Sequence, residues 1–168
     1  MRRCTVVLVA CALVLSLVGC QTFMWGTDEL IERVREEFPI ADADTIDIEY
    51  AGNSQTEGRF LHWFISGNSY QEHTYLAMDC TLIEGKGFRF ERALTPMERG
   101  DDIAVAEWNG GYAFCVNNRN CKTIRIKDAA EEKEVDIPWK ENSRPFVYFN
   151  ERIPIEYSFL DENGTPIM

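Results

Sequence analysis

The chain has 168 residues, of which 28 are acidic and 17 are Lys or Arg, so its formal net charge is −11. This length corresponds to a single domain. A hydrophobic content of 45%, with ten Phe, six Tyr and four Trp, supplies enough apolar surface for a packed core and excludes a disordered chain. The acidic balance argues against binding to nucleic acid, because phosphate recognition needs clustered Lys and Arg.

The N-terminus has the features of an export signal. Arg2 and Arg3 precede an uncharged, largely apolar stretch over residues 6–18. A charged start followed by a short hydrophobic run is typical of a secretory signal. The run is too short to cross a bilayer comfortably, since a membrane-spanning helix needs roughly 20 apolar residues.

The signal ends in Leu17, Val18, Gly19 and Cys20. This ending resembles the lipobox of bacterial lipoproteins, and the resemblance covers only about the first 20 residues. It implies that residues 1–19 are removed and that Cys20 carries a diacylglyceryl thioether, with a further acyl chain such as palmitate on its amino group. The protein would then be anchored by lipid on the extracytoplasmic face of a bacterial membrane. The alternative is an ordinary cleaved signal, or an uncleaved anchor, with a cysteine there by chance.

A short lipidated tether over residues 20–26 and a single globular domain over residues 27–168 are expected to follow. The loss of two signal arginines leaves the mature chain more acidic, and anionic head groups repel an acidic domain. The lipid, and not surface charge, would therefore hold the protein on the membrane. Phe23, Met24 and Trp25 would either rest at the lipid interface or pack on their own domain.

One short amphipathic helix is predicted at the start of the domain. Thr27 is a favourable N-cap, and Asp28 and Glu29 suit the positive end of a helix dipole. Apolar residues then recur at helical spacing, and the pattern ends at Pro39. These residues are Leu30, Ile31, Val34 and Phe38.

The rest of the chain alternates with a period of two, which indicates strands separated by turn residues. The predicted strands are 45–50, 59–66, 73–84, 87–92, 103–108, 111–116, 122–127, 146–149 and 155–160. Residues 129–134 are expected to form a loop or a single turn. The pattern predicts an α+β fold with the helix packed on one mostly antiparallel, meander-rich sheet of about eight or nine strands.

Asn109 and Gly110 predict a two-residue hairpin turn with positive φ at both positions. This turn places two cross-strand pairs on one core face, Val105 with Phe114 and Ile103 with Val116. The following hairpin is expected to place Ile124 and Ile126 beside Tyr112 and Phe114. The opposite face is expected to point toward solvent and consists of Ala104, Ala106, Ala113, Cys115, Cys121, Arg125 and Lys127.

Cys115 and Cys121 lie near one hairpin end in this register, and exported proteins occupy an oxidising compartment. A disulfide between them is therefore predicted. The alternative is a redox or metal pair, but the spacing differs from CxxC and no His is nearby in the sequence. Cys80 is either a buried inert thiol or a site of intermolecular pairing.

A second candidate group involves both histidines. If Gly67 and Asn68 form a two-residue turn, His62 and His73 are cross-strand neighbours. They would then share a possible binding face with Phe60, Phe64 and Tyr75. Two His can contribute to a metal site, but no third ligand is assignable. A core or rim histidine pair is favoured, and neither a metal nor another cofactor is predicted.

The sequence contains no GxSxG, GxxxxGK or HExxH motif. The favoured hypothesis is a non-enzymatic lipoprotein that binds a protein or another component of the cell envelope close to the bilayer. One alternative is a small metal- or ligand-binding protein, or a hydrolase, that uses His62 and His73. Another is a purely structural envelope protein.

Overall fold

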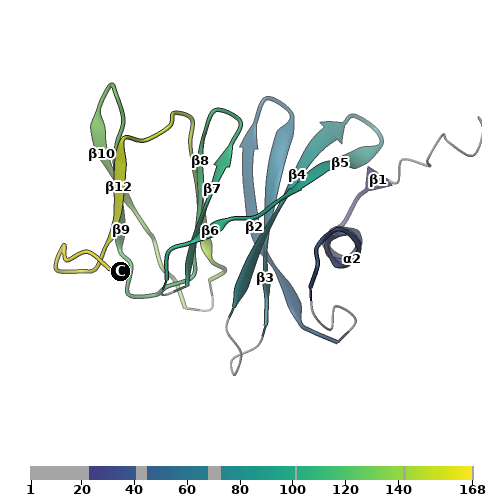
Figure 1. The fold of residues 1–168 in the computed structure, drawn as a ribbon, viewed down its shortest axis with the longest axis horizontal. Helices are drawn as coiled ribbons and strands as arrows, with labels where there is room; N and C mark the ends of the chain where they lie inside the picture. Colours follow the sequence, from purple (N-terminus) through teal and green to yellow (C-terminus); the bar gives the residue numbers. More distant parts are fainter. Residues whose placement is uncertain (1–22, 41–44, 68–72, 101, 142, 168) are drawn as a thin grey trace, which may run out of the picture.

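The structure is a computed structural model that describes residues 23–40, 45–67, 73–100, 102–141 and 143–167. These residues form one helix and twelve strands. The strands pair antiparallel in three separate sheets, which are stacked in layers (Figure 1). The predicted α+β class is confirmed, but the expected single sheet of eight or nine strands is wrong. No helix among the described residues is long and apolar enough to cross a membrane.

The first sheet, sheet A, has the strand order β1-β5-β4-β3-β2. Helix α2, Thr27–Glu37, covers its outer face with Leu30 and Val34, which pack in one cluster with Phe64 and Met78. Gly26 and not Thr27 occupies the N-cap position of this helix. The strands of sheet A are β1 (Phe23–Met24), β2 (Ile48–Thr56), β3 (Arg59–Ser66), β4 (Thr74–Ile83) and β5 (Gly87–Leu94).

Sheet B is the middle layer and has the order β11-β8-β7-β6. Its hairpin turn is confirmed, because Asn109 has φ 47°, Gly110 has φ 78° and Trp108 pairs with Gly111. The predicted pairing of Val105 with Phe114 is also confirmed. The strands of sheet B are β6 (Met97–Glu98), β7 (Ile103–Trp108), β8 (Gly111–Val116) and β11 (Phe146–Asn150).

Sheet C is the outer layer farthest from the helix, with the order β10-β9-β12. Ile124 and Ile126 do share a core with Phe114, as expected, but from the facing sheet and not from an adjacent strand. The neighbour of β8 within its own sheet is β11, because the segment after Val116 carries the chain into the next layer. The strands of sheet C are β9 (Thr123–Lys127), β10 (Glu132–Asp136) and β12 (Glu156–Leu160).

The middle sheet is covered on both faces, which overturns part of the predicted solvent face. Side chains between sheets A and B surround the indoles of Trp63 and Trp108. Small residues on sheet B leave room for these rings, so alanine here marks a tight core and not exposure. The buried residues are Ala104, Ala106, Ala113 and Cys115 between sheets A and B, and Cys121 between sheets B and C; only Arg125 and Lys127 of the predicted set are exposed.

Gly111 is expected to tolerate no side chain. A Cβ at this position would lie 2.0 Å from the carbonyl oxygen of Asn150 on β11. Gly111→Ala should therefore push β8 and β11 apart and lower the free energy of unfolding by about 2 kcal/mol, measured by urea denaturation. Gly26→Ala, where no atom lies within 4 Å of a Cβ, is the control, and it should show only the smaller loss that Ala causes at a helix N-cap. An equal effect of both substitutions would contradict this explanation.

Candidate functional site

The predicted lipidation site, Cys20, lies outside the described residues. Part of the predicted tether is folded: Phe23 pairs with Arg89 and Met24 with Phe88, so β1 is an edge strand of sheet A. Met24 is 3% exposed and belongs to the core beneath helix α2. Of the two expectations for the tether, packing on the domain therefore holds for Met24.

Gly87 allows this close approach of β1. Its φ is +92°, and a Cβ on it would lie 2.6 Å from the carbonyl oxygen of Met24. A side chain at position 87 would therefore separate the N-terminal segment from the sheet. Trp25, the next residue along the chain, differs from Met24 in leaving 64% of its surface exposed.

The predicted disulfide between Cys115 and Cys121 is wrong in this structure, because both are free thiols. Cys115 packs between sheets A and B, whereas Cys121 packs between sheets B and C. The prediction placed both residues on one face of one hairpin, but the chain changes layer between them. Burial raises the pKa of Cys115 and of Cys121, and raises the pKa of Cys80 to about 12, so all three are protonated thiols at neutral pH.

The predicted histidine pair is also not formed. His62 pairs with Met78, and the β3–β4 register continues through Ile65 opposite Tyr75, so the connection is longer than the assumed two-residue turn. The proposed binding face therefore divides between two sides of sheet A. Phe60, His62 and Phe64 face the helix side, Tyr75 faces sheet B, and His73 lies just before β4 at the end of the sheet.

His62 is a core residue. Its side chain lies against the rings of Phe60 and Phe88, with centroid distances of 5.9 and 4.7 Å. The Tyr50 hydroxyl lies 3.1 Å from Nδ1, and Nε2 has no hydrogen-bond partner among the described residues. Burial lowers the pKa of His62 to about 4, which keeps the ring neutral at neutral pH.

His73 belongs to a different polar group. Its Nδ1 lies 2.7 Å from Oδ1 of Asp102, and the Tyr75 hydroxyl donates to the same oxygen over 3.1 Å. Burial and the Asp102 carboxylate raise the pKa of Tyr75, so this phenol remains protonated. Tyr75 and His73 are therefore joined through Asp102 and not through the predicted aromatic face.

A cleft of about 590 Å³ opens beside His73. Its walls are formed by the first turns of α2, the edge strand β2, the end of β3 with the residue before β4, and the segments that flank β8 and β11. The cleft combines an apolar surface with several polar groups. The apolar residues are Ile31, Ile48, Ala51, Ile65 and Pro145, and the polar ones include Glu49, His73, Asn117, Arg119, Ser143 and Arg144.

Aromatic rings hold both arginines of the cleft in place. The guanidinium carbon of Arg119 lies 4.4 Å from the ring centroid of Trp139, and that of Arg144 lies 5.8 Å from the ring centroid of Tyr50. Arg119 also donates from Nη1 to the hydroxyl of Ser143 over 2.7 Å and from Nη2 to the backbone carbonyl oxygen of Ser143. These contacts orient the guanidinium groups without neutralising their charge.

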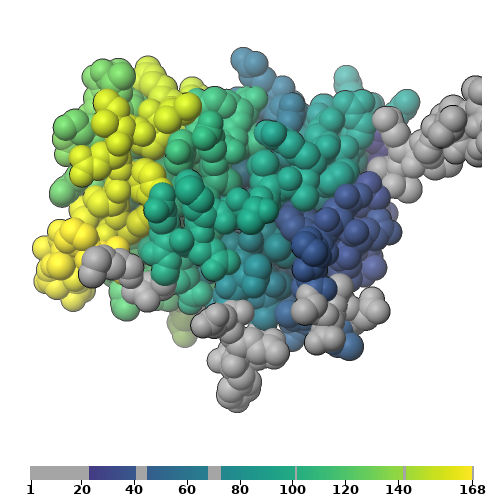
Figure 2. Space-filling view, in the orientation of Figure 1, coloured from purple at the N-terminus to yellow at the C-terminus, as the bar shows by residue number. Residues whose placement is uncertain are grey.

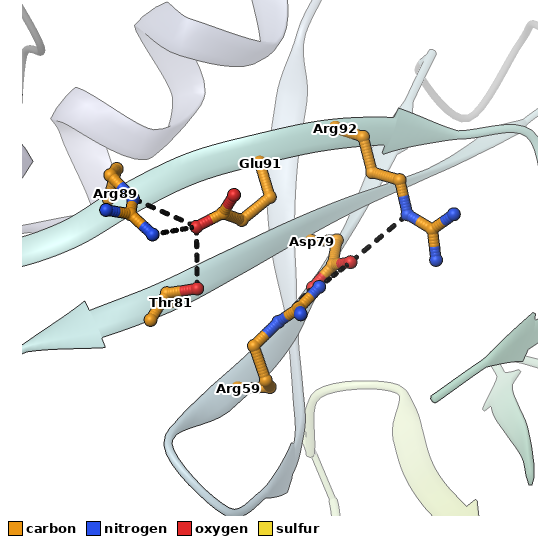
Figure 3. Close-up of polar contacts among 6 residues, drawn as sticks. All are labelled: Arg59, Asp79, Thr81, Arg89, Glu91 and Arg92. Carbon is orange, nitrogen blue, oxygen red and sulfur yellow. Dashed lines mark hydrogen bonds and ion pairs between the residues drawn. The ribbon is translucent and has the colours of Figure 1, made fainter. Parts of the chain in front are cut away.

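A second charged cluster lies on sheet A and is fully paired (Figure 3). Asp79 on β4 has no exposed side-chain surface, and it accepts hydrogen bonds from Arg59 on β3 and from Arg92 on β5. Beside it, Glu91 accepts from Thr81 and Arg89, and these hydrogen bonds lower the pKa of Glu91. Because its donors and acceptors satisfy each other, this cluster is a cross-strand structural network.

No protein-family model, curated protein or solved structure matches this chain. Among the described residues, no group of three or more His, Cys, Asp or Glu side chains is placed to hold a metal ion. The described residues do form the cleft with Arg119 and Arg144, which the sequence pattern did not single out. Both arginines lie outside strands, where no hydrophobic periodicity marks a position as facing a site.

Proposed function

We propose that this chain is a lipoprotein of the bacterial cell envelope, anchored through Cys20 on the extracytoplasmic side of the membrane, whose folded domain binds a partner close to the bilayer. The position of β1 is the observation that supports this proposal most directly. Only two residues separate Cys20 from Phe23, where the paired strand begins. An extended chain spans at most about 3.6 Å per residue, so the sheet edge would lie within roughly 11 Å of the lipidated cysteine.

The layered fold determines how the anchored domain would be oriented relative to the membrane. Helix α2 and sheet A lie at one end of the molecule, and sheet C lies at the opposite end (Figures 1 and 2). Attachment through β1 would hold sheet A near the bilayer and direct sheet C away from it. Trp25, which follows β1, would then lie at the depth where Trp is favoured at a lipid interface.

Two features support a binding role for the domain. The cleft has the mixed apolar and polar lining of a ligand site, and the edge strands β2 and β10 can accept an extended partner. The alternative metal or hydrolase function depended on His62 facing His73. That arrangement is absent, because His62 lies in the core and His73 pairs with Asp102.

The anchor is tested by the intact mass of the chain extracted with detergent from its native membranes. We expect a chain that begins at Cys20 and carries diacylglyceryl and acyl mass. Reduction should leave the mass unchanged, because the structure has free thiols at Cys80, Cys115 and Cys121. Cys20→Ser should abolish the acyl mass, and Cys11→Ser, a cysteine change within the signal, should not. An unacylated wild-type chain in the soluble fraction would contradict the proposal.

A further inference from the structure

We propose that the cleft between β2 and the segments carrying Arg119 and Arg144 binds an oxyanion, a carboxylate or a phosphate, that is attached to a small apolar group. This inference rests on the proposed binding function and specifies the ligand class. It does not depend on acylation of Cys20, because every residue that carries it lies in the folded domain.

Arginines in the described ranges differ in whether they pair with a carboxylate. Seven of the arginines in the described ranges have an acidic partner, as Arg59 and Arg92 have in Asp79. Arg99, Arg119 and Arg144 have no ion pair with a described carboxylate. Acidic partners are abundant in a chain with a net charge of −11. Two arginines without such a partner in one cleft therefore make this cleft locally positive on an acidic protein.

The two arginines of the cleft are oriented before any ligand binds. Trp139 and Tyr50 support their guanidinium groups, so part of the entropy cost of ordering them is already met in the free protein. A guanidinium group presents parallel N–H donors that match the two oxygens of a carboxylate or phosphate. Both groups lie at the same cleft but come from separate segments, so a bound oxyanion would join the segment after β8 to the one before β11.

The apolar part of the lining defines the rest of the ligand. Ile48 and Ile65 contribute from sheet A, and Pro145 lies beside Arg144. These surfaces favour an aliphatic or aromatic group next to the oxyanion. Glu49 on the same cleft disfavours a ligand with negative charge spread over several groups. Free polyanions therefore fit less well than a compact anion with an apolar substituent.

The proposal is tested by calorimetric titration of the full chain in a non-ionic detergent. The probes are n-butyl phosphate, butyrate and inorganic phosphate. We expect saturable binding of n-butyl phosphate with one site per chain, and weaker binding of inorganic phosphate, which lacks the apolar group. Arg144→Gln should weaken binding by about tenfold, because it removes one charge-assisted pair of hydrogen bonds. Arg119→Gln should weaken binding by a smaller factor, because Nη1 and Nη2 of Arg119 already donate to Ser143 in the free protein.

The matched control is Arg125→Gln on sheet C, which changes the net charge equally but lies outside the cleft. It should leave the affinity unchanged. Arg144 is the more informative variant, because its guanidinium group contacts the Tyr50 ring at the surface of the cleft. The melting temperature of Arg144→Gln should therefore remain that of the wild type. Absence of saturable binding, an equal loss in the Arg125→Gln variant, or equal affinity for inorganic and butyl phosphate would overturn the proposal.

A competition experiment distinguishes the two sources of such a ligand. Soluble dihexanoyl phosphatidylglycerol should displace n-butyl phosphate if the natural ligand is a lipid head group, and should fail to displace it if the ligand is a free anion. The titration measures binding to the folded domain alone, so a failure to bind anions would not contradict the proposed lipid anchor. An unacylated Cys20 would likewise leave the titration interpretable.

Discussion

Arg59→Leu is expected to lower the free energy of unfolding by about 3 kcal/mol, the lower end of the range for breaking a buried ion pair. The carboxylate of Asp79 has no exposed surface and receives two N–H donors from Arg59. After the substitution, its remaining charged partner is Arg92, whose side chain is 57% exposed and donates only through Nε. Urea denaturation at neutral pH measures the change.

The control for this prediction is Arg125→Leu. Arg125 pairs with Glu134 on the outer surface of sheet C, and both side chains are largely exposed. Exposed pairs contribute less than about 1 kcal/mol, so this variant should remain close to the wild type. The double variant Arg59→Leu with Asp79→Leu should recover part of the lost stability, because no buried charge is left unpaired. Equal losses for Arg59→Leu and Arg125→Leu would contradict the buried network.

His62 is expected to make the protein less stable as the pH falls from about 6.5 to about 4. Burial lowers its pKa from 6.5 in the unfolded chain to about 4 in the folded protein. Above pH 6.5 both states hold a neutral ring. Between these pKa values the unfolded chain takes up a proton that the native state does not. The free energy of unfolding therefore decreases by about 1.4 kcal/mol per pH unit, or about 3 kcal/mol over the window.

The variant that isolates this effect is His62→Phe, which places a third aromatic ring beside Phe60 and Phe88 and cannot titrate. Carboxylates that titrate in the same range are common to both proteins, so the difference between wild type and variant removes their contribution. That difference should shift in favour of the variant by about 3 kcal/mol between pH 7 and pH 4. Parallel stability curves for the two proteins would show that His62 is not buried as a neutral ring.

The cleft and the Asp79 network occupy different parts of sheet A. The Asp79 cluster spans β3, β4 and β5, whereas the cleft lies along β2 at the opposite edge. Substitutions at Arg144 should therefore alter ligand binding without the loss of stability expected at Arg59. This separation allows the oxyanion proposal to be tested in a fully folded protein.

Local sequence patterns were sufficient for much of the secondary structure. The strands 59–66, 103–108 and 111–116 have the predicted bounds, because alternating apolar residues and the turn at Asn109 and Gly110 act over neighbouring positions. The same rules missed β10, Glu132–Asp136, whose acidic sequence alternates only weakly. This strand forms because β9 offers it a partner at the exposed edge of sheet C.

Tertiary structure alone decided how the strands were distributed among layers. An alternating pattern distinguishes the two faces of a strand, but it does not indicate whether the second face contacts solvent or another sheet. The pattern therefore predicts solvent exposure for Ala104 and Cys115, whereas both are buried between sheets A and B. The change of layer separates Cys115 from Cys121, whereas the longer β3–β4 connection separates His62 from His73. The cleft likewise depends on segments far apart in the chain, since Ile48, Arg119 and Arg144 meet only when sheets A and B are stacked. Burial against a facing layer is a property of the whole fold, and a pattern over neighbouring residues cannot contain it.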